Sequence, residues 1–125
     1  MTPKRSLIVV ATALLVLVAG VVRAEDKKYD SKYDNLDVEA ILQNDAERNI
    51  YYACFMDTGP CPNEAAIFFK GHAPEAVVTS CRYCTQKQLE MFEKIVSWFV
   101  DNSPQEWNAL IEKTINDARK QGLSF

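Results

Sequence analysis

The sequence contains a single histidine, His72, and its 14 basic residues are outnumbered by 17 acidic ones. A hydrolytic triad needs a nucleophile, a general base and a residue that orients the base, and no such set surrounds this histidine. Net negative charge disfavours nucleic-acid phosphates, which are bound by clusters of Lys and Arg. We therefore expect no catalytic residues, no cofactor and no nucleic-acid partner, with His72 on the surface or in a turn.

Alternating runs of β-branched residues joined by hairpin turns are also absent, which argues against a β-sheet. The chain shows no internal repeat and no low-complexity tract. Apolar residues instead recur at three- and four-residue steps, most clearly over 89–100, and this spacing is typical of amphipathic helices.

A long apolar run occurs only near the N-terminus, over 7–22, after two basic residues and before a short segment ending at Ala24. This order is typical of a secretory signal peptide, and the run is shorter than the roughly 20 residues that a membrane-spanning helix needs. We expect residues 1–24 to be cleaved off after Ala24, leaving 25–125 as one soluble, extracellular domain without stable membrane insertion. Cleavage removes three basic residues and no acidic one, so the formal charge falls from −3 to −6.

Capping residues predict five or six helices in the mature region, and hence an all-α domain. The residue types preferred at helix N-caps occur at Asp37, Asn44, Thr85 and Ser103. In the last three cases a Glu or Gln follows three residues later, as in a capping box. Pro62 suits the first turn of a third helix, and the segment 71–74, which contains Gly and Pro, is expected to interrupt that helix. Gly122 is expected to end the last helix.

The four cysteines are Cys54, Cys61, Cys81 and Cys84, and they allow three disulfide connectivities. Proximity along the chain favours the local pairs Cys54–Cys61 and Cys81–Cys84, and small secreted domains often depend on such bridges. The second pair also has the spacing of a redox dithiol, but no strand precedes it as in thioredoxin-like proteins. The spacing of the first pair is unusual for a zinc site, so we expect structural bridges and no metal.

The spacing of the cysteines resembles that of the insect chemosensory protein family, also called OS-D-like. The three intervals are six, nineteen and two residues, where the family usually has eighteen in the middle. Further similar segments stand in the same order along the chain: 32–35, 36–45, 57–61, 74–76, 84–88 and the segment around Trp107. The extra residue is expected near 69–72, where the third helix would bulge or break. The C-terminal part is short compared with the family, so a sixth helix is expected to be missing or fused to the fifth.

The resemblance implies a compact five- or six-helix assembly around a hydrophobic channel, closed by the two local disulfides. It implies a secreted, non-enzymatic carrier that transports small lipophilic molecules, such as semiochemicals and fatty-acyl compounds, as a monomer. The residues expected to contact the ligand are Tyr33, Ile41, Leu42, Tyr51, Phe68, Leu89, Phe92, Ile95, Val96, Phe99, Trp107 and Leu110. Two alternatives stay open: a secreted interaction or developmental protein without a ligand, and a thiol oxidoreductase that uses Cys81 and Cys84.

Overall fold

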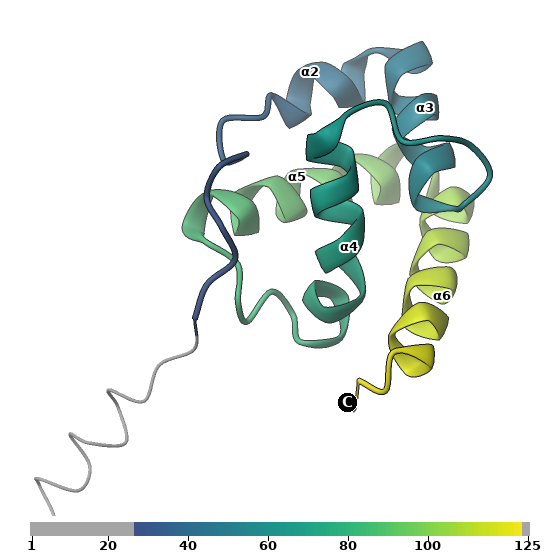
Figure 1. Ribbon diagram of the computed structural model, residues 1–125. Coiled ribbons are helices and arrows are strands. Elements are labelled where there is room, and N and C mark those ends of the chain that lie inside the picture. Colours follow the sequence, from purple (N-terminus) through teal and green to yellow (C-terminus); the bar gives the residue numbers. More distant parts are fainter. Residues whose placement is uncertain (1–26, 124–125) are drawn as a thin grey trace, which may run out of the picture.

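Five α-helices make up most of the computed structural model, which describes residues 27–123 (Figure 1). The helices are α2 (Val38–Gln43), α3 (Asp45–Phe55), α4 (Glu64–Val78), α5 (Gln86–Asn102) and α6 (Pro104–Lys120). This part of the chain contains no strand, so the predicted all-α class is confirmed. The predicted signal peptide, 1–24, lies outside the described residues.

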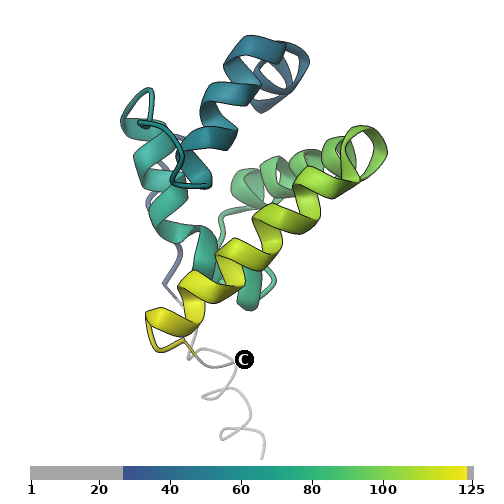
Figure 2. The ribbon, with the colours of Figure 1, turned by 90° about the vertical axis from the view of Figure 1, so that its right-hand side faces the viewer.

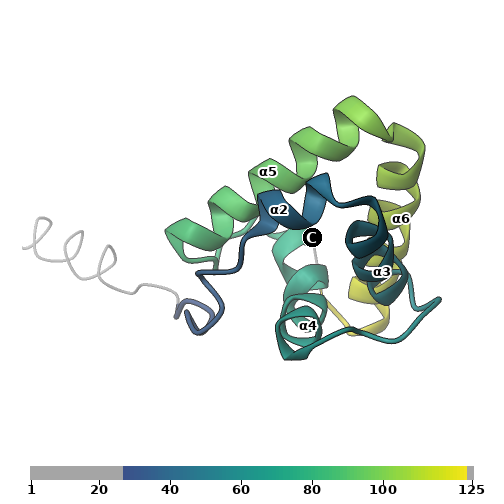
Figure 3. The same cartoon turned by 90° about the horizontal axis from the view of Figure 1, so that it is seen from above.

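The five helices contact one another in a closed ring. Helix α2 packs against α3, α3 against α4, α4 against α6, α6 against α5, and α5 returns to α2. Figure 2 shows α6 along one side of the ring, and Figure 3 shows α2 lying beside α5. None of the helices between residues 27 and 123 combines the length and the apolar character needed to cross a bilayer. Because the helices form a ring, they surround an interior that their side chains must fill or leave open.

The predicted N-caps of α2, α3 and α5 are confirmed. Each cap oxygen accepts a hydrogen bond from the backbone N–H three residues later, and the capping residues are Asp37, Asn44 and Thr85. In α5 the box is complete, because the backbone N–H of Thr85 also donates to the side chain of Gln88 at 2.9 Å. These caps satisfy N–H groups that a helix start leaves without partners, so local sequence decides where the three helices begin.

Helix α4 starts later than predicted, whereas α6 starts at Pro104 as predicted but lacks the expected capping bond. Helix α4 begins at Glu64 and is capped by the side chain of Asn63, so Pro62 lies outside it. An amide side chain at this position supplies an acceptor that a proline lacks, which moves the start by two residues. Ser103 does precede α6, but its hydroxyl donates to the Glu106 carboxylate at 2.6 Å and caps no backbone N–H.

The predicted interruption at 71–74 is wrong, because α4 runs unbroken from Glu64 to Val78 with Pro74 inside it. A proline in a helix interior removes one hydrogen bond and costs about 3 kcal/mol. Here Pro74 and the nearby Ala76 are both buried, and this apolar burial offsets part of that cost. As a result, a single helical face extends past the position of the expected break.

The predicted disulfides Cys54–Cys61 and Cys81–Cys84 are both present. The first joins the end of α3 to the loop before α4, and the second closes the turn between α4 and α5. Loop-closure entropy gives each bridge a stabilisation of about 2–2.5 kcal/mol. The buried apolar side chains form two small clusters, one around Phe99 and one around the second disulfide. Neither cluster fills the ring.

Candidate functional site

A cavity of about 180 Å³ lies inside the ring of helices. Its wall includes side chains from all five helices, from the turn that holds the second disulfide, and from the segment 27–37, which we call the N-terminal arm. A single water molecule needs only about 10–15 Å³ of such volume. The cavity therefore admits a group much larger than water.

Eight of the twelve residues predicted to contact a ligand line this cavity. They are Ile41, Leu42, Tyr51, Phe68, Phe92, Ile95, Phe99 and Leu110. They come from α2, α3, α4, α5 and α6, so residues up to 69 positions apart in the chain face one interior space. This placement makes them candidates for ligand contact, and the contact itself stays a prediction.

The other four predicted residues lie next to the wall rather than in it. The Tyr33 ring packs on Phe68, with centroids 5.2 Å apart, and the Trp107 ring stacks on Phe99 with centroids 6.0 Å apart. Leu89 packs against the buried cluster around the second disulfide, and Val96 is half-buried on α5. Tyr33, Trp107 and Leu89 thus contact residues of the wall without lining the cavity.

The sequence analysis missed the middle of α4. Phe69, His72, Ala73 and Ala76 line the cavity together with Phe68, at steps that place all five on one helical face. The spacing that signals this face is visible in the sequence, but it crosses the segment that was interpreted as a break. The remaining missed wall residues are Tyr29, Leu36, Val38, Arg48, Tyr52, Phe55, Cys81, Cys84, Gln88 and Met91.

Most polar side chains of the wall have partners within the protein. The Tyr52 hydroxyl donates to the backbone oxygen of Glu106 at 2.8 Å, and Tyr51 accepts a hydrogen bond from Asn63. Burial raises the pKa of Tyr52, and the nearby Glu106 carboxylate adds to this, so the hydroxyl stays neutral. The interior surface is therefore mainly hydrocarbon and sulfur, which suits an apolar guest.

Arg48 contributes its aliphatic stem to the wall while its charged end is occupied elsewhere. The guanidinium donates to the backbone oxygen of Leu42 at 2.7 Å and pairs with Asp45 at 3.0 Å. It also lies over the Trp98 ring, 4.1 Å from the centroid, in a cation–π contact. A charged side chain can thus border an apolar cavity without offering it a charge.

The N-terminal arm covers one part of the cavity and is fixed by Gln88, which is only 5% exposed. The Gln88 amide donates to the backbone oxygen of Asp30 at 2.9 Å and to the Asp34 carboxylate at 3.0 Å. The Thr85 hydroxyl donates to the other oxygen of the same carboxylate at 2.9 Å. The cap of α5 therefore also binds the arm.

Tyr29 is the arm residue that reaches the wall near His72. Its backbone N–H donates to the Tyr83 backbone oxygen at 2.8 Å, and its hydroxyl donates to the Glu75 carboxylate at 2.8 Å. Burial raises the pKa of Tyr29, and the hydrogen bond to Glu75 raises it further. The Tyr29 ring lies on the His72 ring, with centroids 4.2 Å apart.

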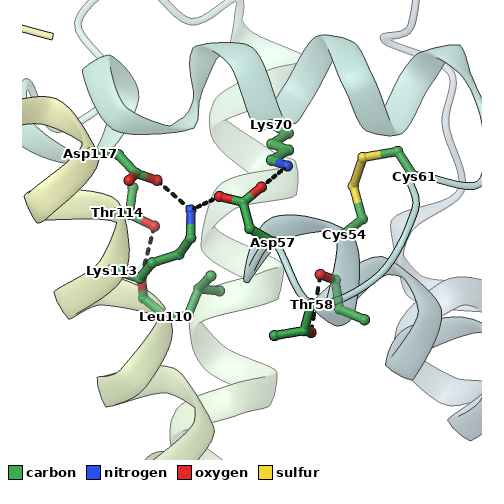
Figure 4. A network of polar contacts seen from close by, with 10 residues as sticks. Cys54, Asp57, Thr58, Cys61, Lys70, Leu110, Lys113, Thr114 and Asp117 are labelled. Carbon is green, nitrogen blue, oxygen red and sulfur yellow. Dashed lines mark hydrogen bonds and ion pairs between the residues drawn. A yellow bond between two sulfur atoms is a disulfide. The ribbon is translucent and has the colours of Figure 1, made fainter. Parts of the chain in front are cut away.

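A network of ion pairs, which we call the charged corner, joins α4 and α6 beside the first disulfide (Figure 4). It consists of Asp57, Lys70, Lys113 and Asp117. Asp57 accepts from both lysines, at 2.6 Å in the case of Lys113, and Lys113 also pairs with Asp117. The hydrogen bond from Lys113, then that from Lys70, lowers the pKa of Asp57 to about 2. The corner fixes the turn after α3 against α4 and α6.

The geometry does not favour thiol chemistry at the second cysteine pair. Cys81 and Cys84 are joined in a disulfide, are 8% and 9% exposed, and both line the cavity. They follow a helix, whereas a thioredoxin-like dithiol follows a strand. Over residues 27–123, no group of three or more His, Cys, Asp or Glu side chains is placed to hold a metal ion.

Comparison with known proteins gives the same picture of the chain. The model of the family described as "Insect pheromone-binding family, A10/OS-D" matches residues 29–121. Ejaculatory bulb-specific protein 3 of Drosophila melanogaster is 40% identical over 101 residues, which cover 81% of this chain and 79% of that protein. Allergen Tha p 1 of Thaumetopoea pityocampa is 29% identical over 99 residues, covering 79% and 78%.

A solved structure shares the fold. It is a chemosensory protein in complex with bromo-dodecanol, which matches with a TM-score of 0.67 and 28% identity over 75% of this chain and 95% of that one. The family resemblance seen in the cysteine spacing is thus confirmed. The chain belongs to the insect pheromone-binding family A10/OS-D.

Proposed function

We propose that the protein is a secreted, monomeric, non-enzymatic carrier that holds a small lipophilic molecule, such as a semiochemical or a fatty-acyl compound, in its cavity. The observation that carries the proposal is the cavity of about 180 Å³ with its apolar wall. The family description and the related structure with bromo-dodecanol support it.

The energy of such binding comes from apolar burial. About 300 Å² of buried ligand surface contributes roughly 7 kcal/mol before the cost of association is subtracted. The remainder corresponds to affinities near the micromolar range, at which a carrier both captures and releases its ligand. This apolar binding does not require the charge of Arg48. Its guanidinium already bonds the backbone oxygen of Leu42 and the carboxylate of Asp45.

A fluorescent fatty-acid probe titrated against the oxidised protein tests the proposal. We expect saturable binding with one site per chain and displacement by dodecanol. Ala73→Leu, which fills part of the cavity, should weaken binding about tenfold, or by about 1.4 kcal/mol. Ala109→Leu adds the same atoms on an exposed position of α6 and should leave binding unchanged. Failure of every long-chain compound to displace the probe would contradict the carrier function.

Secretion is tested separately. Expression of residues 1–125 in insect cells should release into the medium a product that begins at Glu25 and contains two disulfides, as read by intact mass. Retention of the full-length chain in the cell membrane would contradict cleavage after Ala24, without affecting the cavity argument.

A further inference from the structure

The unbroken course of α4 places the single histidine in the cavity wall. His72 follows Phe68 by one helical turn and lines the cavity with it. Had the helix broken at 71–74, this side chain would have been free to face solvent. Its position therefore depends on the helix continuing through Pro74.

His72 differs from every other polar side chain of the wall. The others, all within the described residues, are each engaged in a hydrogen bond with the protein: Tyr29, Arg48, Tyr51, Tyr52 and Gln88. His72 has ring contacts only, with no hydrogen bond anywhere in 27–123. No fully buried side-chain nitrogen in that range lacks a partner, so each ring nitrogen of His72 keeps some accessible surface.

The imidazole is held in place by two aromatic rings. Tyr29 lies on one side with centroids 4.2 Å apart, and Phe68 meets it edge-on at 4.6 Å. Because Tyr29 is itself fixed by its hydrogen bond to Glu75, the stack has little freedom to move. Because the side chain is already held in one position, it can bind a polar group with its unused donor and acceptor atoms at little further cost in side-chain entropy.

We propose that His72 is the polar anchor of the cavity and determines which lipophilic molecules are preferred. A neutral imidazole has one N–H donor and one nitrogen acceptor. It can therefore bind the oxygen of an alcohol or carbonyl head group while the hydrocarbon chain lies against the apolar wall. This inference rests on the proposed carrier function and adds the class of ligand.

The charges around His72 favour a neutral head group over a carboxylate. The Glu75 carboxylate is bound to Tyr29, which stacks on His72, so it places negative charge beside the anchor. The Lys32 ammonium lies 5.7 Å from the centroid of the Phe68 ring, but it is exposed and screened by solvent. The expected ligand is an uncharged amphiphile with a single oxygen-bearing end.

The test compares dodecanol with dodecane, each displacing the same fluorescent probe from the oxidised wild-type protein and from His72→Phe. Phenylalanine keeps the aromatic stack and removes both hydrogen-bonding atoms. We expect the preference for dodecanol over dodecane to fall about 2- to 10-fold in the variant, the range for one neutral hydrogen bond. Dodecane itself should bind the two proteins within about twofold.

Tyr83→Phe is the matched control, because it removes a hydroxyl from a ring that lies beside Tyr29 but outside the cavity wall. It should leave the preference for dodecanol unchanged. His72→Gln, which retains a donor and an acceptor, should keep part of the preference. If His72→Phe does not fold, His72→Ala supplies the same comparison.

An unchanged preference in His72→Phe, or equal losses in His72→Phe and His72→Gln, would overturn the anchor while leaving the carrier function intact. Failure of both compounds to bind the wild-type protein would instead remove the proposed function, and the anchor with it.

Discussion

The charged corner and the N-terminal arm hold the ring of helices by different means. The corner has four charged side chains, among them Asp57, whose side chain is 56% exposed. The arm is held by Gln88, which is 5% exposed, and by the stacked Tyr29. The corner thus relies on ion pairs in contact with solvent, and the arm on partly buried hydrogen bonds.

The difference shows that the number of charges is a poor guide to stability. Exposed ion pairs contribute little because water and salt screen them. A buried hydrogen bond also makes only a small net contribution to the free energy of unfolding. Removing one of its two partners, however, leaves the other polar group unsatisfied, which costs about 1–3 kcal/mol. We therefore expect the arm contacts to be the more sensitive of the two to substitution, although they carry fewer charges.

The largest effect is expected for Gln88→Ala. This change removes the capping box of α5 and leaves the backbone oxygen of Asp30 without its donor. The free energy of unfolding, measured with urea, should fall by about 2–3 kcal/mol. Gln86→Ala, at an exposed position of the same helix, should stay within about 0.5 kcal/mol of the wild type. Equal losses in Gln88→Ala and Gln86→Ala would contradict the special role of Gln88, and a loss no larger than that of Asp57→Asn would contradict the ranking of arm over corner.

A smaller effect is expected for Tyr29→Phe, about 1 kcal/mol at neutral pH, from the lost hydrogen bond to Glu75. Because the pKa of Tyr29 is raised above its ordinary value of 10.0, the folded state retains the proton more strongly than the unfolded state does. Its contribution is complete below pH 10 and is lost as pH rises further. Urea midpoints measured across that range should fall more steeply for the wild type than for Tyr29→Phe. Tyr33→Phe, whose hydroxyl makes only a long, exposed contact with Glu64, should follow the wild type.

The smallest effect is expected for Asp57→Asn, because the corner is exposed. The pKa of Asp57 is lowered from 3.8 to about 2, so its stabilising contribution is present above pH 3.8 and is lost as pH falls toward 2. The difference in urea midpoint between wild type and variant should shrink over that interval, and also with added salt at neutral pH. Asp101→Asn, outside the corner, should show neither trend. A difference that persists at low pH would mean that Asp57 acts through the shape of its turn, which has φ of 60°.

The fold was largely predictable because its main signals are local. The caps at Asp37, Asn44 and Thr85 and the two short-range disulfides depend on residues a few positions apart. The break expected at 71–74 was wrong because the outcome there depends on tertiary burial of Pro74. Backbone preference alone carries no information about such burial.

The candidate site was predictable only in part, for a related reason. Helical periodicity identifies the face that points inward, which places Phe92, Ile95 and Phe99 together in the wall. Periodicity does not tell whether that face meets a solid core or an open space. Trp107 and Val96 therefore fit the predicted face although they do not line the cavity. The position of His72 followed from the continuity of α4 and could not be recognised before the helix was known to be unbroken.

The two tryptophans of the chain flank one wall residue. Trp98 meets the Phe99 ring edge-on with centroids 4.9 Å apart, and Trp107 stacks on it from α6 at 6.0 Å. Any guest that displaces Phe99 also changes the surroundings of both indoles. Their ultraviolet emission should therefore report the filling of the interior directly, so that an unlabelled native sample can serve as its own optical sensor.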